Sequence, residues 1–211
     1  MIDTPQGPAR AHVTHAARPR GALVLGHGAG GGVGARDLVA ARRAALEEGF
    51  SVALVEQPYR VAGKRSPPRA PRLDEAWLVV VEHLRRGELE GLALVTGGRS
   101  SGARVACRTA DATGSIGVLC LAFPLRPPRS ATAPSRLAEL DAVRVPVLVV
   151  QGERDPFGMP PGGPRRTVAP IAGDHSLRSD LDALEAAVSA WLAGLPRARG
   201  RGSRPRTTRR T

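Results

Sequence analysis

The stretch Leu92-Ala93-Leu94-Val95-Thr96-Gly97-Gly98-Arg99-Ser100-Ser101-Gly102-Ala103 decides the fold of this chain. Its apolar first half is typical of a buried strand, and the small residues that follow it favour a closely packed helix. A Gly-x-Ser-x-Gly motif joins the two halves, which is the strand–turn–helix context of a nucleophile elbow. That turn is so sharp that the residues flanking the serine must lack bulky side chains, a need that Gly98 and Gly102 meet. We therefore expect the Ser100 hydroxyl to stand above a sheet edge, within reach of a base.

The motif by itself is weak evidence, because a chain with 25 glycines shows it by chance in roughly one case in several. The wider hydrophobic pattern adds to it. Short apolar runs alternate with helical patterns, which indicates a parallel sheet covered on both faces. Strands are expected at 22–26, 50–55, 92–96, 116–122, 146–150 and, more weakly, 166–169, with an edge strand at 11–15; helices are expected at 33–48, 72–86, 101–111 and 177–191.

These elements predict an α/β fold with a mostly parallel sheet of about six to seven strands, helices on both faces and no lid domain. At 211 residues with 42% apolar composition, the chain is long enough for one such domain, which we place at 1–194. No apolar run approaches the roughly 20 residues of a membrane helix. The first residues lack the features of a signal peptide, so cytoplasmic residence is expected. Cys107 and Cys120 are interpreted as small buried apolar residues.

The formal net charge of +12 is concentrated at the end of the chain. Seven arginines and no acid lie between Gly194 and Thr211, and removing those seven charges leaves +5 for the rest. The segment 195–211 has almost no apolar residue, so we expect a disordered Arg-rich tail. It also lacks the aromatic residues that base stacking needs. We therefore do not expect nucleic acid to be a partner, except through this basic tail. No membrane partner is expected.

The later strands supply the partners that a nucleophilic serine requires. Acyl transfer needs a base to take the hydroxyl proton and a carboxylate to orient that base. Asp155 lies just beyond the apolar run 146–150, and His175 lies immediately before the last helical pattern. The predicted catalytic residues are therefore Ser100, Asp155 and His175, in the chain order Ser, Asp, His. Glu153 and Asp174 remain rival acids, but Asp174 is so close in sequence to His175 that its side chain would tend to point elsewhere.

A glycine-rich loop after the strand at 22–26, Gly26-His27-Gly28-Ala29-Gly30-Gly31-Gly32, suits a site for an oxyanion. We expect the backbone amides of Ala29 and Ser101 to be the two donors. His27 is expected to anchor this loop rather than act as the base. The loop also contains G-x-G-x-x-G, but Glu56 is a late and doubtful candidate for the acid that a dinucleotide site requires. That alternative also leaves the Ser, Asp, His order unexplained.

With these residues in place, the chain resembles small bacterial α/β-hydrolase superfamily proteins, including those similar to dienelactone hydrolase. The resemblance covers residues 22–192 and rests on the loop at 26–30, the motif at 97–102 and the segments 57–59, 123–128, 151–158 and 173–176. It implies a lidless hydrolase core with Ser100, Asp155 and His175 as a catalytic triad. Where this chain has Ser101-Gly102-Ala103 and Leu125-Arg126, similar proteins tend to have Met-Gly-Gly, and an aromatic residue followed by His.

The leading hypothesis is a serine hydrolase that acts on a small carboxylic ester, thioester or lactone through an acyl-enzyme. The expected substrate-binding residues are His27, Gly28, Tyr59, Arg99 and Arg126; the two arginines would favour an anionic substrate. No cofactor and no metal is expected, and His12 and His15 have no neighbouring acids or cysteines that would make them metal ligands. The alternative is a non-catalytic protein-interaction module on the same scaffold. The natural substrate and the oligomeric state do not follow from the sequence.

Overall fold

A computed structural model describes residues 1–128 and 132–196. Within these residues the strands form one seven-stranded sheet in the order β1-β3-β2-β4-β5-β6-β7. The strands are β1 (Arg10–Thr14), β2 (Gly21–Gly26), β3 (Phe50–Glu56), β4 (Leu94–Arg99), β5 (Gly117–Leu121), β6 (Val147–Gly152) and β7 (Arg166–Ile171). All neighbours pair in parallel except β1, which runs antiparallel to β3 at the edge. The predicted mostly parallel sheet is confirmed.

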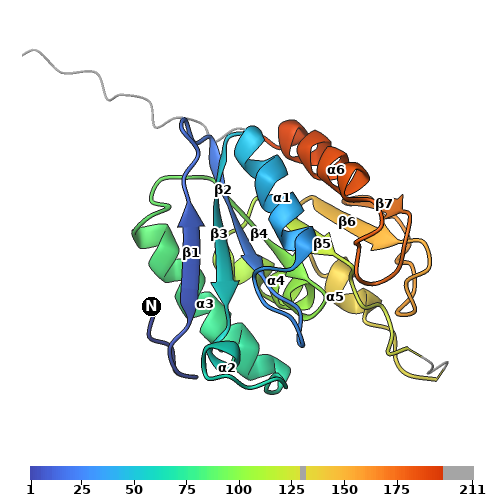
Figure 1. Ribbon diagram of the computed structural model, residues 1–211, viewed down its shortest axis with the longest axis horizontal. Helices are drawn as coiled ribbons and strands as arrows, with labels where there is room; N and C mark the ends of the chain where they lie inside the picture. The colour runs from blue at the N-terminus through green and yellow to red at the C-terminus, as the bar shows by residue number, and fades with distance from the viewer. Residues whose placement is uncertain (129–131, 197–211) are drawn as a thin grey trace, which may run out of the picture.

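Helices cover both faces of this sheet, as the sequence predicted (Figure 1). α1 (Arg36–Glu47) and α6 (Leu181–Gly194) pack on one face, where their apolar residues join Leu23, Leu25 and Leu119 of the strands in one core. α3 (Ala70–Arg86), α4 (Ser101–Thr113) and α5 (Leu137–Asp141) contribute to the cores of the other face. The helix α2 (Pro58–Val61) follows β3 directly. Burial of the central strands on both faces explains their nearly continuous apolar sequences.

The strand order places two loops side by side where the candidate site was expected. From β2 the chain moves outward to β3, and later returns to place β4 on the other side of β2. The loops after β2 and β4 therefore leave the sheet at its point of reversal. In open parallel sheets, this is where ligands bind, beyond the carboxyl ends of the strands. The glycine-rich loop and the Ser100 elbow lie on these two loops.

Besides shifts of a few residues at the ends of other elements, such as β4, the structure departs from the sequence predictions at four short segments. The helices α2 and α5 were not predicted, because one turn of helix carries too few residues for a periodic pattern. The last helix begins at Leu181 rather than at 177, since Leu177 has a φ of 50° and packs into the core from the preceding loop. Leu195, assigned to the tail, is 5% exposed and belongs to the same core. The remainder of the predicted tail, 197–211, lies outside the described residues.

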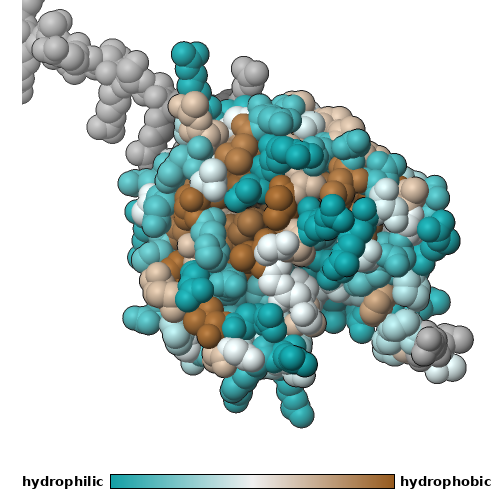
Figure 2. All heavy atoms as spheres, in the orientation of Figure 1, coloured by the Kyte–Doolittle hydropathy of each residue, from teal (hydrophilic) through white to brown (hydrophobic). Residues whose placement is uncertain are grey.

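The surface has few exposed large apolar side chains. Figure 2 shows the face that bears α1 and α6, where an apolar area lies among hydrophilic residues. Val39 of α1 contributes to the exposed apolar surface with 39% of its area accessible. Cys107 and Cys120 are both buried and unbridged, with their sulfur atoms 3.5 Å apart, so the interpretation of both as buried residues is confirmed. No helix among the described residues is long and apolar enough to span a membrane.

Candidate active site

Ser100 lies at the turn between β4 and α4 in a backbone conformation that a serine rarely adopts. Its φ is 53° and its ψ is −107°, and its amide donates a hydrogen bond of 2.8 Å to the carbonyl of Leu121. A Cβ atom added to Gly98 or to Gly102 would lie 2.5 Å from the Gly26 carbonyl oxygen. The two glycines of the motif are thus required because α4 and β2 approach the turn so closely. Strain of this kind persists only where the surrounding structure holds it, and is frequent at functional sites.

The side chains of Ser100, His175 and Asp155 form one continuous chain of hydrogen bonds. His175 comes from the loop between β7 and α6, and Asp155 from the loop after β6. The Ser100 Oγ is 3.0 Å from His175 Nε2, and His175 Nδ1 is 2.8 Å from Asp155 Oδ2. A carboxylate only accepts hydrogen bonds, so Nδ1 donates to Asp155 and leaves Nε2 to accept from the serine hydroxyl. The ring is therefore oriented to receive the proton of Ser100.

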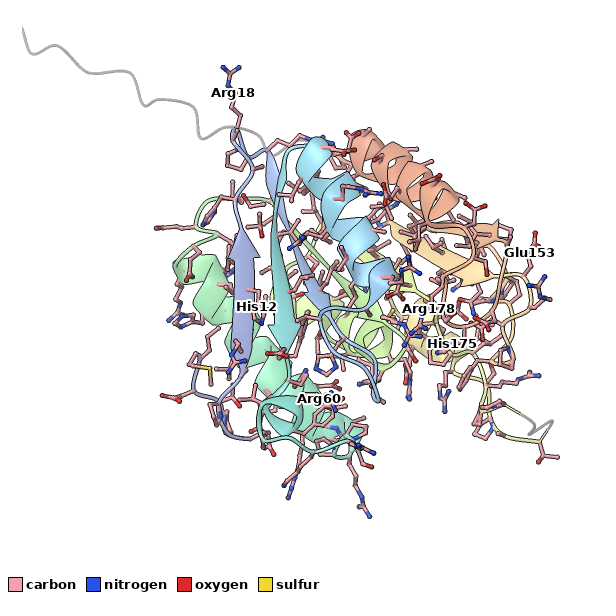
Figure 3. All side chains as sticks on the ribbon, viewed as in Figure 1. His12, Arg18, Arg60, Glu153, His175 and Arg178 are labelled. Carbon is pink, nitrogen blue, oxygen red and sulfur yellow. The ribbon has the colours of Figure 1, made fainter. Side chains whose placement is uncertain are left out.

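The two rival acids lie elsewhere. Glu153 is exposed, and Figure 3 shows it at the rim of the molecule, away from His175. Asp174 is also exposed, and its carboxylate accepts hydrogen bonds from the amide and the hydroxyl of Ser176. These two bonds lower the pKa of Asp174 and use the side chain to hold the turn beside His175. Of the three candidate acids, Asp155 is the one that contacts the imidazole.

Two residues that the sequence analysis missed hold Asp155 and His175 in place. The side-chain nitrogen Nε2 of Gln151 lies 2.8 Å from Asp155 Oδ2. It also lies within hydrogen-bonding distance of the backbone carbonyls of Phe123 and Gly158. The backbone amide of Phe157 donates to Asp155 Oδ1 at 2.9 Å, and its ring lies 4.3 Å from the imidazole, centroid to centroid. A polar residue at the end of the apolar strand β6 was the available signal for Gln151.

The loop after β2 is fixed by His27, which is 2% exposed. Its Nδ1 lies 2.8 Å from the carbonyl of Gly28, and its Nε2 accepts a hydrogen bond from the amide of Gln57 at 3.1 Å. One ring nitrogen donates and the other accepts, which describes the neutral ring. Burial lowers the pKa of His27 and favours the same state. Both ring nitrogens are used within the protein, so His27 occupies an anchoring position rather than a substrate-facing one.

Tyr59, on α2, holds the same loop from another side. Its hydroxyl donates a hydrogen bond of 2.9 Å to the carbonyl of Ala29, and its ring contacts His27 edge-on at a centroid distance of 5.7 Å. The amides of Ala29 and Ser101 donate no hydrogen bond to any residue that the structure describes. Both are thus available as donors to a ligand, and Ser101 adds the positive end of the α4 dipole.

The two arginines predicted to bind substrate lie in different surroundings. Arg126 is exposed on the loop after β5, and its backbone amide donates to the carbonyl of Phe157. Arg99 instead directs its guanidinium inward, where Nε lies 2.8 Å from a carboxylate oxygen of Asp37 on α1. Its Nη2 donates to the backbone carbonyl of His175 at 3.1 Å. Arg99 is therefore already engaged with protein groups, whereas Arg126 faces solvent.

A cavity of about 310 Å³ lies beside Tyr59, which is one of its lining residues. It is lined by residues of the N-terminal segment, of α2 and of the proline-rich stretch before α3, among them Gln57, Lys64 and Arg72. Ser100 and His175 are not among its lining residues. Tyr59 connects the two regions, because its side chain lines the cavity while its hydroxyl bonds to Ala29.

The strand order, the elbow and the loops that meet at Ser100 define an α/β-hydrolase fold. Sequence comparison agrees, since a family model described as an alpha/beta hydrolase domain matches residues 19–165. The chain belongs to this family of hydrolases. Among curated proteins, no sequence matches the chain.

Several solved structures share the fold of this chain at low sequence identity. A lidless α/β serine hydrolase from Xanthomonas campestris has 20% identity and a TM-score of 0.69, with 92% of this chain and 94% of that one covered. A dienelactone hydrolase from Anabaena variabilis has 13% identity and a TM-score of 0.72, covering 93% and 96%. Est1E from Butyrivibrio proteoclasticus, solved with bound ferulic acid, has 17% identity and a TM-score of 0.69, covering 87% and 94%.

Proposed function

We propose that this protein is a serine hydrolase that cleaves a small carboxylic ester, thioester or lactone through an acyl-enzyme. The observation that carries the proposal is the hydrogen-bonded chain from Ser100 through His175 to Asp155, on a strained elbow of the α/β-hydrolase fold. Membership of a hydrolase family agrees with it.

In the first step Ser100 Oγ attacks the carbonyl carbon of the substrate while His175 Nε2 takes the hydroxyl proton. The imidazolium that forms is stabilised by Asp155, whose carboxylate already accepts the Nδ1 hydrogen. His175 then gives its proton to the departing alcohol or thiol, and the acyl group remains on Ser100. A water molecule, deprotonated by the same ring, attacks the carbonyl carbon of the acyl-enzyme. The bond to Ser100 Oγ then breaks, the ring returns the proton to Oγ, and the acid is released. A lactone would follow the same steps, with its leaving alcohol remaining attached to the acyl group.

The negative charge that develops on the carbonyl oxygen requires donors that are already in place. We assign this role to the amides of Ala29 and Ser101. The loss of one such donor in comparable enzymes lowers kcat by roughly 10²- to 10³-fold. Contacts with Tyr59 and His27 hold the Ala29 loop in place. A donor that is held in this way needs no rearrangement during the reaction.

The site's surroundings favour small substrates of the ester type. No lid domain is present among the described residues, and Ser100 is partly exposed. The exposed Arg126 supplies a positive charge on the loop after β5 and would favour an anionic acyl group. The similarity in fold to a dienelactone hydrolase and to a protein solved with ferulic acid suggests that carboxylate-bearing esters and lactones should be tried first.

The direct test is covalent labelling with a fluorophosphonate probe, followed by peptide mapping. The wild-type protein should be labelled at Ser100, and Ser100→Ala should not be labelled. A panel of esters, thioesters and lactones of different chain length and charge would then define the acyl preference. Absence of labelling, together with refusal of the whole panel and co-purification of a protein partner, would support the non-catalytic alternative instead.

A further inference from the structure

Arg99 connects three parts of the molecule that must stay in register for the proposed reaction. It lies between Gly98 and Ser100, and its side chain is only 20% exposed. Nε reaches Asp37 in the first turn of α1, and Nη2 reaches the backbone carbonyl of His175. The third nitrogen, Nη1, approaches the loop after β2 so closely that a Cβ on Gly28 would lie 2.8 Å from it.

Asp37 is the buried acid that pairs with this guanidinium, and its other carboxylate oxygen accepts a hydrogen bond from the amide of Leu38. Its side chain is 1% exposed, and burial raises its pKa against the opposing effect of the Arg99 charge. A carboxylate in such a position requires a paired cation, because an isolated buried charge is strongly destabilising. The ion pair therefore fixes the guanidinium in place, and the planar fork of an arginine can then donate in a defined direction to a second acceptor.

That second acceptor is the residue whose ring must bridge Ser100 and Asp155. His175 lies within the turn that the Asp174–Ser176 hydrogen bond closes, and Leu177, which follows, has a φ of 50°. A shift of this backbone would move the imidazole relative to both of its partners. Misplacement by about 1 Å can cost roughly 10²-fold in rate. A hydrogen bond from the residue next to the nucleophile ties the two positions directly to one another.

We propose that Arg99 is a positioning residue, held by Asp37, which fixes the backbone of His175 relative to Ser100. It does not bind the substrate, in contrast to the role that the sequence suggested. This inference concerns the geometry of the site and rests on the proposed function only where catalysis is used to measure it.

The test compares Arg99→Gln, Arg99→Lys and the double variant Arg99→Gln/Asp37→Asn with the wild type. Arg43→Gln is the matched control. Arg43 lies on α1 and pairs with an acid, Glu185 of α6, and among the described residues it forms no hydrogen bond or ion pair with a residue of the site. The double variant removes both charges, so it remains usable where Arg99→Gln leaves Asp37 unpaired and does not fold. Thermal unfolding establishes which variants are folded.

Two readouts separate positioning from substrate binding. For neutral and anionic esters alike, Arg99→Gln and the double variant should lower kcat about ten- to hundredfold with little change in KM. Arg99→Lys should recover part of the rate, and Arg43→Gln should match the wild type. In proton NMR, the strongly downfield signal expected for the His175 hydrogen bonded to Asp155 should weaken or exchange faster in the double variant.

The outcomes distinguish this inference from the proposed function. If the wild type is not labelled at Ser100, the proposed function fails, and the NMR signal alone decides the role of Arg99. Unchanged kcat and an unchanged NMR signal in the folded variants would overturn the positioning role. A rise in KM confined to anionic esters would also overturn it, because that result describes a substrate-binding arginine.

Discussion

At the scale of single residues, the Ser100 elbow shows why two glycines of the motif are fixed by their surroundings. A β-carbon on Gly98 would meet the carbonyl oxygen of Gly26 at 2.5 Å and the carbonyl carbon of Gly102 at 2.8 Å. Both contacts are with backbone atoms, which cannot rotate away as the end of a side chain can. The space that an alanine needs could therefore be gained only by moving β2 or α4.

We predict that Gly98→Ala lowers the free energy of unfolding by about 1–3 kcal/mol, the range for overpacked cores, and abolishes labelling at Ser100. Urea denaturation of purified proteins provides the measurement. Gly194→Ala is the control, because a β-carbon there would have no atom within 4 Å outside its own helix backbone and immediate neighbours. Equal stability of the Gly98 variant and this control would show that the elbow tolerates a larger residue.

Tyr59 offers a second test at this scale, because it is the one tyrosine in the chain. Burial raises its pKa to about 12, so its ultraviolet titration should have a midpoint near 12 in the folded protein. The unfolded chain should titrate near 10. Since the folded pKa is the higher one, the associated stability is complete below pH 10 and is lost as the pH rises from 10 to 12. A midpoint near 10 in a protein that is still folded would contradict the burial of this hydroxyl.

The sequence predicted which residues could react, but not which residues support them. Ser100, Asp155 and His175 were selected from motif spacing and from their positions after strands, and the structure brings the three side chains into contact. Gln151 and Phe157 contact Asp155 from nearby in the sequence, but only the folded loop after β6 turns these groups toward the carboxylate. Asp37 pairs with Arg99 from a different element of the fold. Nothing in the local pattern distinguishes an arginine that faces solvent, as Arg126 does, from one that pairs with a buried acid, as Arg99 does.

At the scale of elements, the loops after β2 and β3 are joined through His27. The ring accepts a hydrogen bond from Gln57 and lies beside the carbonyl of Gly28. Because these contacts need the neutral ring, the position of the Ala29 loop depends on the protonation state of a buried histidine. Acid should therefore weaken the connection between the two loops before it affects the sheet.

We predict a loss of stability on acidification that originates at His27. Its pKa is lowered in the folded state, so below about pH 6.5 the unfolded chain binds a proton that the folded protein resists. The stability present above pH 6.5 is thus lost as the pH falls toward the lower folded pKa. Urea titrations between pH 7.5 and pH 5, values chosen to bracket this window, give the free energy of unfolding at each pH. This free energy should fall less steeply with decreasing pH for His27→Gln than for the wild type.

The His27→Gln variant should also be less stable at pH 7.5 by about 1–3 kcal/mol, the cost of leaving buried polar groups unpaired. If the free energy of unfolding of both proteins depends on pH in the same way, the loss of stability in acid does not originate at His27.

The success of the element predictions depended on length and on burial. Residues 22–26 and 50–55 form strands buried on both faces, and a mostly apolar run with glycine nearby identifies them. The short helices α2 and α5 contain too few residues for a pattern. Leu177 was assigned to the last helix because its spacing fits the stripe of Leu181 and Leu184. Leu177 is buried, but it lies in the loop before the helix. Spacing alone cannot distinguish a buried leucine of the helix from a buried leucine of the preceding loop.

At the scale of the whole molecule, Leu195, which follows the last helical residue, still packs against the rest of the domain. The side chain of Leu195 is 5% exposed and joins the core formed by α1, α6 and the sheet. Leu195, assigned to the tail from its sequence, therefore packs with the residues that precede it. The residues that follow 196 lie outside the described part of the chain.

We predict that a chain ending at Pro196 unfolds at the same urea concentration as the full chain and is labelled at Ser100 at the same rate. Leu195→Ala in either chain should instead cost about 2–5 kcal/mol, as for other buried leucines. Binding of both chains to nucleic acid at several salt concentrations would show in addition whether the arginines after 196 bind phosphates. A clear loss of stability in the shortened chain would mean that residues after 196 contribute to the packed domain.

The cavity beside Tyr59 contains the one lysine of the chain, Lys64, and that side chain is exposed. An amine-directed dye would therefore attach at a single internal position, apart from the terminal amine. Its fluorescence would report whether small molecules enter the cavity. Because Tyr59 touches both the cavity and the Ala29 loop, the same dye would also register events at Ser100 if the two regions communicate.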